Sequence, residues 1–70
     1  MKRTRVTSSA VASVGYDPAR QVLEIEFRSG NVYQYFSVPP EVHDALMRAP
    51  SKGRFVNASI RDAYPHVHKS

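Results

Sequence analysis

The chain has 70 residues, a net charge of +4 at neutral pH and no cysteine. A chain of this length forms one small domain with a single core, and without cysteine it has neither a disulfide framework nor a thiolate metal site. No apolar run approaches the ~20 residues that a membrane-spanning helix needs, and the N-terminus lacks the apolar centre of a signal peptide. We therefore expect a cytoplasmic protein that makes no membrane contact.

The positive charge belongs to the ends of the chain. Residues 1–8 are basic and rich in hydroxyls, which predicts a disordered basic arm, and residues 66–70 are expected to form a C-terminal tail. Four of the ten Lys and Arg residues lie in these two segments, so the six that remain equal the six Asp and Glu residues. The predicted folded domain, residues 9–65, is therefore neutral on the whole.

The first folded element expected is a β-strand over residues 10–16, in which Val14 lies on the apolar face. Gly15 within this strand indicates a bulge or a close approach of another backbone. Asp17 and Pro18 then favour a type I turn, because aspartate accepts backbone hydrogen bonds and proline presets φ. The first strand is therefore expected to pair antiparallel with the next.

A β-hairpin over residues 22–36 is the element around which the chain is organised. Its first strand alternates apolar residues with Glu24 and Glu26, which is typical of a strand with one buried face and one solvated face. Gly30 provides the positive φ that the turn needs. An aromatic and β-branched run follows as the second strand, so we expect a three-stranded meander whose carboxylate face contacts water.

The register of the hairpin decides where the two tyrosines of its second strand point. A type I turn followed by Gly30 in the left-handed region places Tyr33 opposite Ile25 and Tyr35 opposite Leu23. Both rings then share the apolar face. A slip of one residue would move both rings to the carboxylate face, and we favour the first register.

Two helices are predicted after the hairpin. Pro39 and Pro40 end the strand because proline cannot donate to a β-ladder, and Pro40 suits the first turn of a helix that continues to Ala49. Pro50 ends this helix, and Ser51 is a good N-cap for the second one. The predicted fold is therefore α+β with the order βββαα, a three-stranded antiparallel meander with two helices packed on one face.

Several short motifs of the chain occur together in one known family. They are Val14-Gly15-Tyr16-Asp17, Leu23-Glu24-Ile25-Glu26-Phe27, Gly30, Tyr33-x-Tyr35, Val38-Pro39 and Ser51-x-Gly53-x-Phe55-x-Asn57-x-x-Ile60-Arg61-x-x-Tyr64. On these residues the chain resembles the KTSC domain, a module found at the C-terminus of some lysyl-tRNA synthetases and as a free-standing bacterial protein. The resemblance covers residues 9–65 and implies a binding module without an established activity, for which RNA binding has been suggested.

The start of the second helix is the first candidate site. Its unpaired N–H groups and the helix dipole favour an anion, and neighbouring basic side chains add charge. The predicted anion- or RNA-binding residues are Ser51, Lys52, Gly53, Arg54, Asn57 and Arg61. The alternative interpretation is an ordinary capped helix start with a solvated basic face.

The pair Tyr33 and Tyr35 is the second candidate. Exposed aromatic residues on a sheet can stack the bases of single-stranded RNA. In the preferred register, however, both rings lie under the helices, and in the slipped register Glu24 and Glu26 would repel phosphate. We therefore interpret Tyr33 and Tyr35 as core aromatics.

No catalytic residue, metal site or cofactor site is predicted. His43, His66 and His68 lack the cysteine or carboxylate pattern that would complete a zinc site, and neither a nucleophile–base grouping nor a phosphate-binding loop is present. The functional hypothesis is a small non-catalytic module that binds RNA or tRNA through the basic helix start. The alternative is a protein-interaction module that docks another protein through its sheet edge or forms a homodimer.

Overall fold

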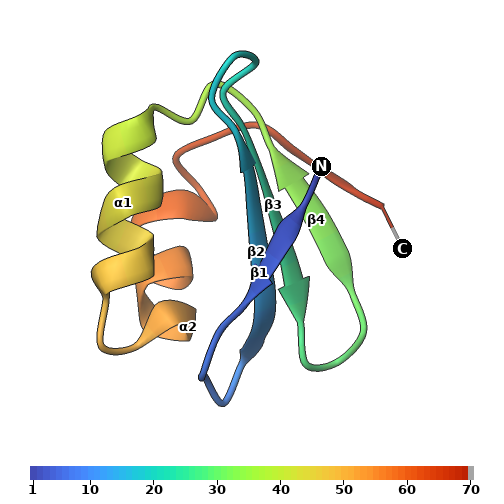
Figure 1. Ribbon diagram of the computed structural model, residues 1–70, viewed down its shortest axis with the longest axis vertical. Coiled ribbons are helices and arrows are strands. Elements are labelled where there is room, and N and C mark those ends of the chain that lie inside the picture. The colour runs from blue at the N-terminus through green and yellow to red at the C-terminus, as the bar shows by residue number, and fades with distance from the viewer. Residues whose placement is uncertain (70) are drawn as a thin grey trace.

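The computed structural model describes residues 1–69 and has two layers, an antiparallel β-sheet and a helical layer on one of its faces (Figure 1). The predicted α+β class is confirmed. The five strands follow one another across the sheet in sequence order. The elements are β1 (Arg3–Arg5), β2 (Val11–Asp17), β3 (Val22–Phe27), β4 (Val32–Tyr35), α1 (Pro40–Arg48), α2 (Lys52–Phe55), the π-helical turn η1 (Val56–Ile60) and β5 (His66–His68).

The predicted number of strands is wrong, because the sheet has five strands and not three. The additional strands, β1 and β5, come from residues 1–8 and 66–70, which the sequence pattern places outside the folded domain; residue 70 itself lies outside the described residues. Each added strand is three residues long and exposed throughout. Neither therefore carries the apolar alternation by which a half-buried strand is found in a sequence.

The hairpin has the predicted register. Tyr33 pairs with Ile25 and Tyr35 pairs with Leu23. Gly30 has a φ of 98°, a left-handed conformation that glycine adopts without steric strain. Because side chains alternate along a strand, both tyrosines lie on the same face of the sheet as the buried residues of β3.

The core lies between the helical layer and β2 and β3. It is closed at the start of α1, where the Tyr16 hydroxyl donates a hydrogen bond to the Val38 carbonyl. Its buried side chains are Val11, Val14, Leu23, Ile25, Tyr35, Val38, Leu46, Val56 and Ile60. Most of the buried strand residues in this set come from β2 and β3, so these two strands are the best covered part of the sheet.

The helices begin as predicted. Pro40 is the first residue of α1, and the Ser51 Oγ accepts a hydrogen bond from the Arg54 backbone N–H at 3.4 Å, which makes Ser51 the N-cap of α2. The helix then widens in η1, where the Arg61 N–H donates to the Val56 carbonyl, five residues earlier, at 2.8 Å. Within residues 1–69 no helix has the length and apolar character required to cross a bilayer.

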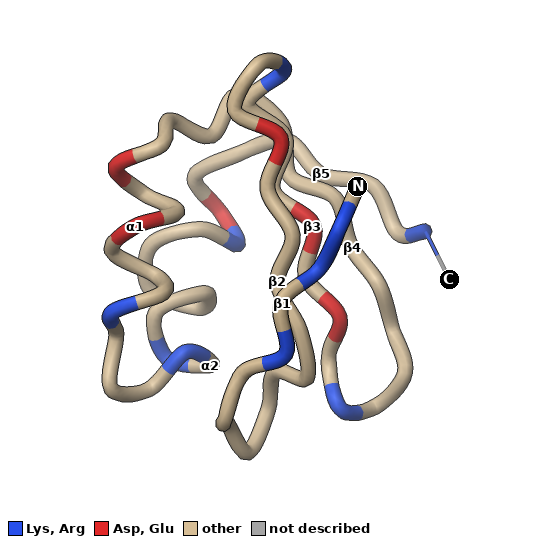
Figure 2. Tube along the Cα trace, viewed as in Figure 1, with Lys and Arg blue, Asp and Glu red and all other residues tan. Residues whose placement is uncertain are grey.

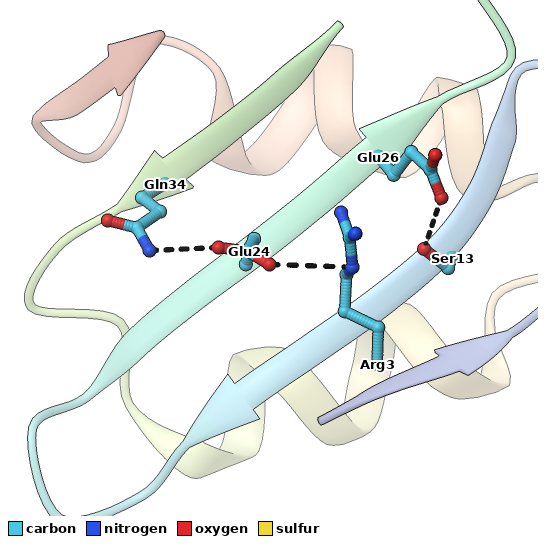
Figure 3. Close-up of polar contacts among 5 residues, drawn as sticks. All are labelled: Arg3, Ser13, Glu24, Glu26 and Gln34. Carbon is cyan, nitrogen blue, oxygen red and sulfur yellow. Dashed lines mark hydrogen bonds and ion pairs between the residues drawn. The ribbon is translucent and has the colours of Figure 1, made fainter. Parts of the chain in front are cut away.

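Acidic residues mark α1 and β3, and basic residues mark β1 and the start of α2 (Figure 2). The carboxylate face of the sheet is less exposed to solvent than predicted, because side chains of neighbouring strands bind the carboxylates of Glu24 and Glu26 (Figure 3). Arg3 Nε lies 3.5 Å from a carboxylate oxygen of Glu24, whose side chain is only 14% exposed. Gln34 donates a hydrogen bond to Glu24 at 2.9 Å, and Ser13 donates one to Glu26 at 2.8 Å.

Gly15 makes room for β1 on the neighbouring strand. A Cβ atom at this position would lie 2.8 Å from Arg3 Cγ and 3.0 Å from the Lys2 carbonyl oxygen, which is closer than real Cβ contacts. The interpretation of Gly15 as a point of close backbone approach is therefore confirmed. The segment that approaches it is the basic N-terminus.

Candidate functional site

A groove of about 520 Å³ lies between the second helix and the β4–β5 side of the sheet. Its floor is aromatic, its helical wall carries Asn57 and Arg61, and the β3–β4 turn with Arg28 also lines it. We define the aromatic floor as Phe27, Tyr33, Tyr35 and His66. The groove therefore brings the two candidate tyrosines and part of the predicted basic set to one place.

Strand β5 completes the aromatic floor. His66 pairs with Tyr35, and His68 pairs with Tyr33, so both imidazoles lie on the same face of the sheet as the tyrosines. The His66 ring lies 5.4 Å from the Tyr35 ring and 5.8 Å from the Tyr33 ring, and His68 stacks on Tyr33 at 4.7 Å between centroids. Phe27 meets the edge of Tyr33 at 5.8 Å. The result is one continuous cluster of rings.

The rings of this floor differ in their contact with water. Tyr35 is 3% exposed and belongs to the core, whereas Tyr33 is half-buried and His66 is exposed. The interpretation of both tyrosines as core aromatics therefore describes Tyr35 better than Tyr33. Tyr35 is therefore the buried part of the floor, and Tyr33 and His66 are its more exposed part.

Arg61 lies close enough to Tyr35 to affect the ionisation of its hydroxyl. Burial raises the pKa of Tyr35 above its ordinary value of 10.0, the neighbouring Tyr33 raises it further, and the positive charge of Arg61 lowers it in part. Because the net effect is upward, Tyr35 stays protonated near neutral pH. Tyr35 and Arg61 both line the groove, which therefore contains an uncharged tyrosine and an arginine.

The two side chains of the helical wall are available to a ligand. Neither Asn57 nor Arg61 makes a side-chain hydrogen bond or an ion pair to another residue of the described range 1–69. Arg28, across the groove, is fixed in place because its Nε donates to the Ser8 carbonyl at 3.0 Å. No Asp or Glu of residues 1–69 lines the groove, so the charged residues of its lining, Arg28 and Arg61, are both positive.

The helical wall of the groove is formed by the π-helical turn η1 and the residue that follows it. Asn57 lies within η1, and the backbone N–H of Arg61 closes its wide turn onto Val56. Such turns insert one extra residue into a helix and occur often at functional sites. Here the insertion coincides with the only helical segment that reaches the groove within residues 1–69.

The other four predicted site residues remain at the helix start and outside the groove. Lys52 Nζ donates to the Ala49 carbonyl at 3.0 Å, so its ammonium group satisfies the end of α1. Gly53 packs against Ala10, since a Cβ atom at Gly53 would lie 3.0 Å from the Ala10 Cβ. Ser51 is occupied as the N-cap, and Arg54 is exposed. The six predicted residues therefore do not form a single site.

Sequence reasoning missed several groove residues, among them Phe27, Arg28 and His66. Phe27 and Arg28 adjoin the turn of the hairpin, and His66 lies in β5. The alternation of His66 and His68 about Val67 is a strand pattern, but three residues are too short for it to stand out. No sequence pattern indicates that residues 66–68 pair with the edge of β4.

The histidines do not converge on a metal site. His43 stacks on Tyr16 with the ring centroids 4.6 Å apart, whereas His66 and His68 lie on β5. Among residues 1–69 no group of three or more His, Cys, Asp or Glu side chains is arranged to hold a metal ion.

Known proteins with similar sequences share nearly the whole chain. The family model of the KTSC domain matches residues 7–64. An uncharacterised protein of Stutzerimonas stutzeri is 54% identical over 57 residues, which are 81% of this chain and 80% of that protein. A lysine–tRNA ligase of Nostoc punctiforme is 45% identical over 56 residues, which are 80% of this chain and 10% of the ligase.

A solved structure has the same fold. The crystal structure of a KTSC domain protein from Yersinia pestis matches with a TM-score of 0.95 and 40% sequence identity. The match covers 99% of this chain and 97% of the Yersinia chain. The sheet and both helices described above are therefore shared between the two proteins.

Proposed function

The chain belongs to the KTSC domain family, and from this premise we propose that it is a small non-catalytic module that binds RNA. The observation that carries the proposal is the groove, whose two arginines, Arg28 and Arg61, have no carboxylate beside them among the lining residues of the described range. A cationic groove favours a polyanion. A relative of the chain is a lysine–tRNA ligase, and this supports RNA or tRNA as that polyanion.

Contacts to phosphate carry most of the proposed affinity. The guanidinium group of Arg61 can donate paired hydrogen bonds to phosphate oxygens, and the Asn57 amide can donate beside it. Contacts of this kind position a nucleic acid without reading its sequence. Binding of this type requires no reacting group, which is why we propose a non-catalytic role. The same proposal places the chain in the cytoplasm, where it would encounter RNA.

A salt-dependent titration tests the proposal. We expect the full chain to bind fluorescently labelled single-stranded RNA and tRNA, with an affinity that falls steeply between about 50 and 200 mM salt. Arg61→Ala should weaken binding about 10-fold or more, because a hydrogen bond to a charged group contributes about 1.5–3 kcal/mol. Fluorescence anisotropy measures both effects.

The matched control is Arg48→Ala. Arg48 is an exposed arginine in the last turn of α1 and does not line the groove. Its removal changes the net charge by the same amount, so it should reduce RNA affinity much less than Arg61→Ala. Absence of RNA binding at low salt, or equal losses in the two variants, would contradict the proposal.

A second candidate function is protein interaction through the edges of the sheet. Both edge strands, β1 and β5, are short and exposed, and the outer side of an edge strand can pair with a strand of another chain. This function predicts self-association, or a bound protein, that tolerates high salt. Size-exclusion chromatography with light scattering tests it, and a strict monomer at all salt concentrations counts against a homodimer.

A further inference from the structure

We propose that the groove holds one unpaired nucleotide of a single RNA strand, with its base against the aromatic floor and its phosphate at Arg61. This inference rests on the proposed RNA binding and specifies which part of the RNA enters the groove. Three features of the site lead to it: the accessible rings, the unpaired cation and the size of the groove.

The accessible rings lie on the face of the sheet away from the carboxylates, and this face favours an anionic ligand. Tyr33 is half-buried and His66 is exposed, and both line the groove. The confirmed register places Glu24 opposite Gln34, on the other face of the sheet. The carboxylates therefore do not face a base that lies on these rings. Stacking of a base on an aromatic side chain strengthens the binding of a single strand.

The charges of the groove lie beside the rings. Arg61 comes from the helical wall and lines the same groove as Tyr33 and His66. Arg28 lines the same groove from the β3–β4 turn, and its Nε donates to the Ser8 carbonyl. A ligand that fits both features needs a planar ring joined to an anion. A nucleotide has both, and phosphate accepts charge-assisted hydrogen bonds from arginine.

The size of the groove limits what can enter. A volume of about 520 Å³ lies within the range of about 300–1,000 Å³ found for pockets that enclose a drug-sized ligand. A nucleotide is a ligand of that size. A paired duplex keeps its bases stacked inside the helix and presents phosphates and groove edges. Only an unpaired base can therefore reach the floor.

The experiment compares strands that differ only in their bases. Anisotropy titrations at low salt use a labelled RNA strand of about six nucleotides, within the usual range of about 4–16 for a single-strand site, an abasic strand of equal length and a duplex. We expect the RNA strand to bind about 10-fold more tightly than the abasic strand, as stacking of one base implies. The duplex should bind no better than the abasic strand.

Three variants locate the base. Tyr33→Leu keeps apolar bulk without a ring and should remove the preference for the RNA strand while leaving the affinity for the abasic strand unchanged. Tyr33→Phe keeps the ring and should retain the preference. His66→Ala should also reduce it. Because His66 is exposed, this variant reports on the floor even if Tyr33→Leu fails to fold by circular dichroism.

The outcomes separate this inference from the proposed function. Equal binding of the RNA and abasic strands, or a preference that survives both Tyr33→Leu and His66→Ala, overturns the nucleotide site and leaves RNA binding intact. A duplex that binds as tightly as the single strand does the same. If no strand binds at low salt, both proposals fail. Displacement of the strand by an equal concentration of polyglutamate would indicate an acidic protein ligand and would also overturn the inference.

Discussion

The β2–β3 part of the sheet and its β4–β5 part use the same face in different ways. Leu23 and Ile25 on β3 have no exposed surface, whereas Tyr33 on β4 is half-buried and His66 on β5 is exposed. The strand register is continuous across this boundary. Coverage by the helices therefore decides whether a side chain on this face belongs to the core or to the groove. Aromatic residues that carry a polar group suit this boundary, because the ring can be buried while the polar group contacts water.

The largest expected effect on the free energy of unfolding comes from a cavity in the part of the core that the helices cover. Leu46 on α1 is completely buried, and Leu46→Ala should lower the free energy of unfolding by about 2–5 kcal/mol. Arg61→Ala, at the groove, should change it by less than about 0.5 kcal/mol because surface substitutions are nearly neutral. Urea denaturation followed by circular dichroism measures both values. Equal losses in the two variants would contradict the division of the sheet.

A smaller effect is expected at the boundary, where Tyr35 lies under the groove. Burial raises the pKa of Tyr35 above 10.0, so the folded chain retains a proton that the unfolded chain releases. The contribution to stability is complete below the unfolded pKa and is lost as the pH rises through the folded pKa. The free energy of unfolding should therefore fall above about pH 10.

Tyr35→Phe removes this titration and should make the alkaline decline shallower. Part of the decline should remain, because burial and, to a lesser extent, the charge of Glu41 also raise the pKa of Tyr16. Urea midpoints measured from about pH 8 to 11 give the comparison. An unchanged slope in Tyr35→Phe would show that Tyr35 has the same pKa in both states.

The smallest effect is expected on the opposite face of the sheet. Arg3→Ala removes the ion pair with Glu24, whose two side chains are 33% and 14% exposed. Ion pairs with access to solvent contribute about 0.2–1 kcal/mol, and salt screens them. The difference in unfolding free energy between Arg3→Ala and the unaltered chain should shrink as salt is added. A loss of unfolding free energy above about 2 kcal/mol in Arg3→Ala would mean that the carboxylate face of the sheet stabilises the fold as much as the helix-covered face does.

The covered part of the molecule could be predicted from the sequence because its signals are local. The alternation around Glu24 and Glu26 gave the strand, Gly30 set the register, and Pro40 and Ser51 marked the starts of the helices. The edge strands have no such signal. β1 and β5 exist because their backbones pair with β2 and β4, and an exposed three-residue strand does not need apolar side chains.

The groove could be predicted only in part, for a different reason. The sequence points to Asn57 and Arg61 in one candidate site and to Tyr33 and Tyr35 in another, whereas the structure places all four around one groove. Their meeting depends on how far the helices extend over the sheet and on the return of β5 to β4, which are tertiary features. The contact of Lys52 with the end of α1 likewise cannot be read from residue spacing.

The π-helical turn of η1 has a consequence for how relatives of this chain compare. In an α-helix each residue advances by about 100° around the axis, but a π-helical turn fits one extra residue into a single turn, here between Val56 and Arg61. A relative with one residue fewer in this segment can close the turn with an α-helical bond and keep its arginine at the same angle to the sheet. Alignment columns across this turn should therefore be matched by helical phase, with a gap of one residue, and not by residue count.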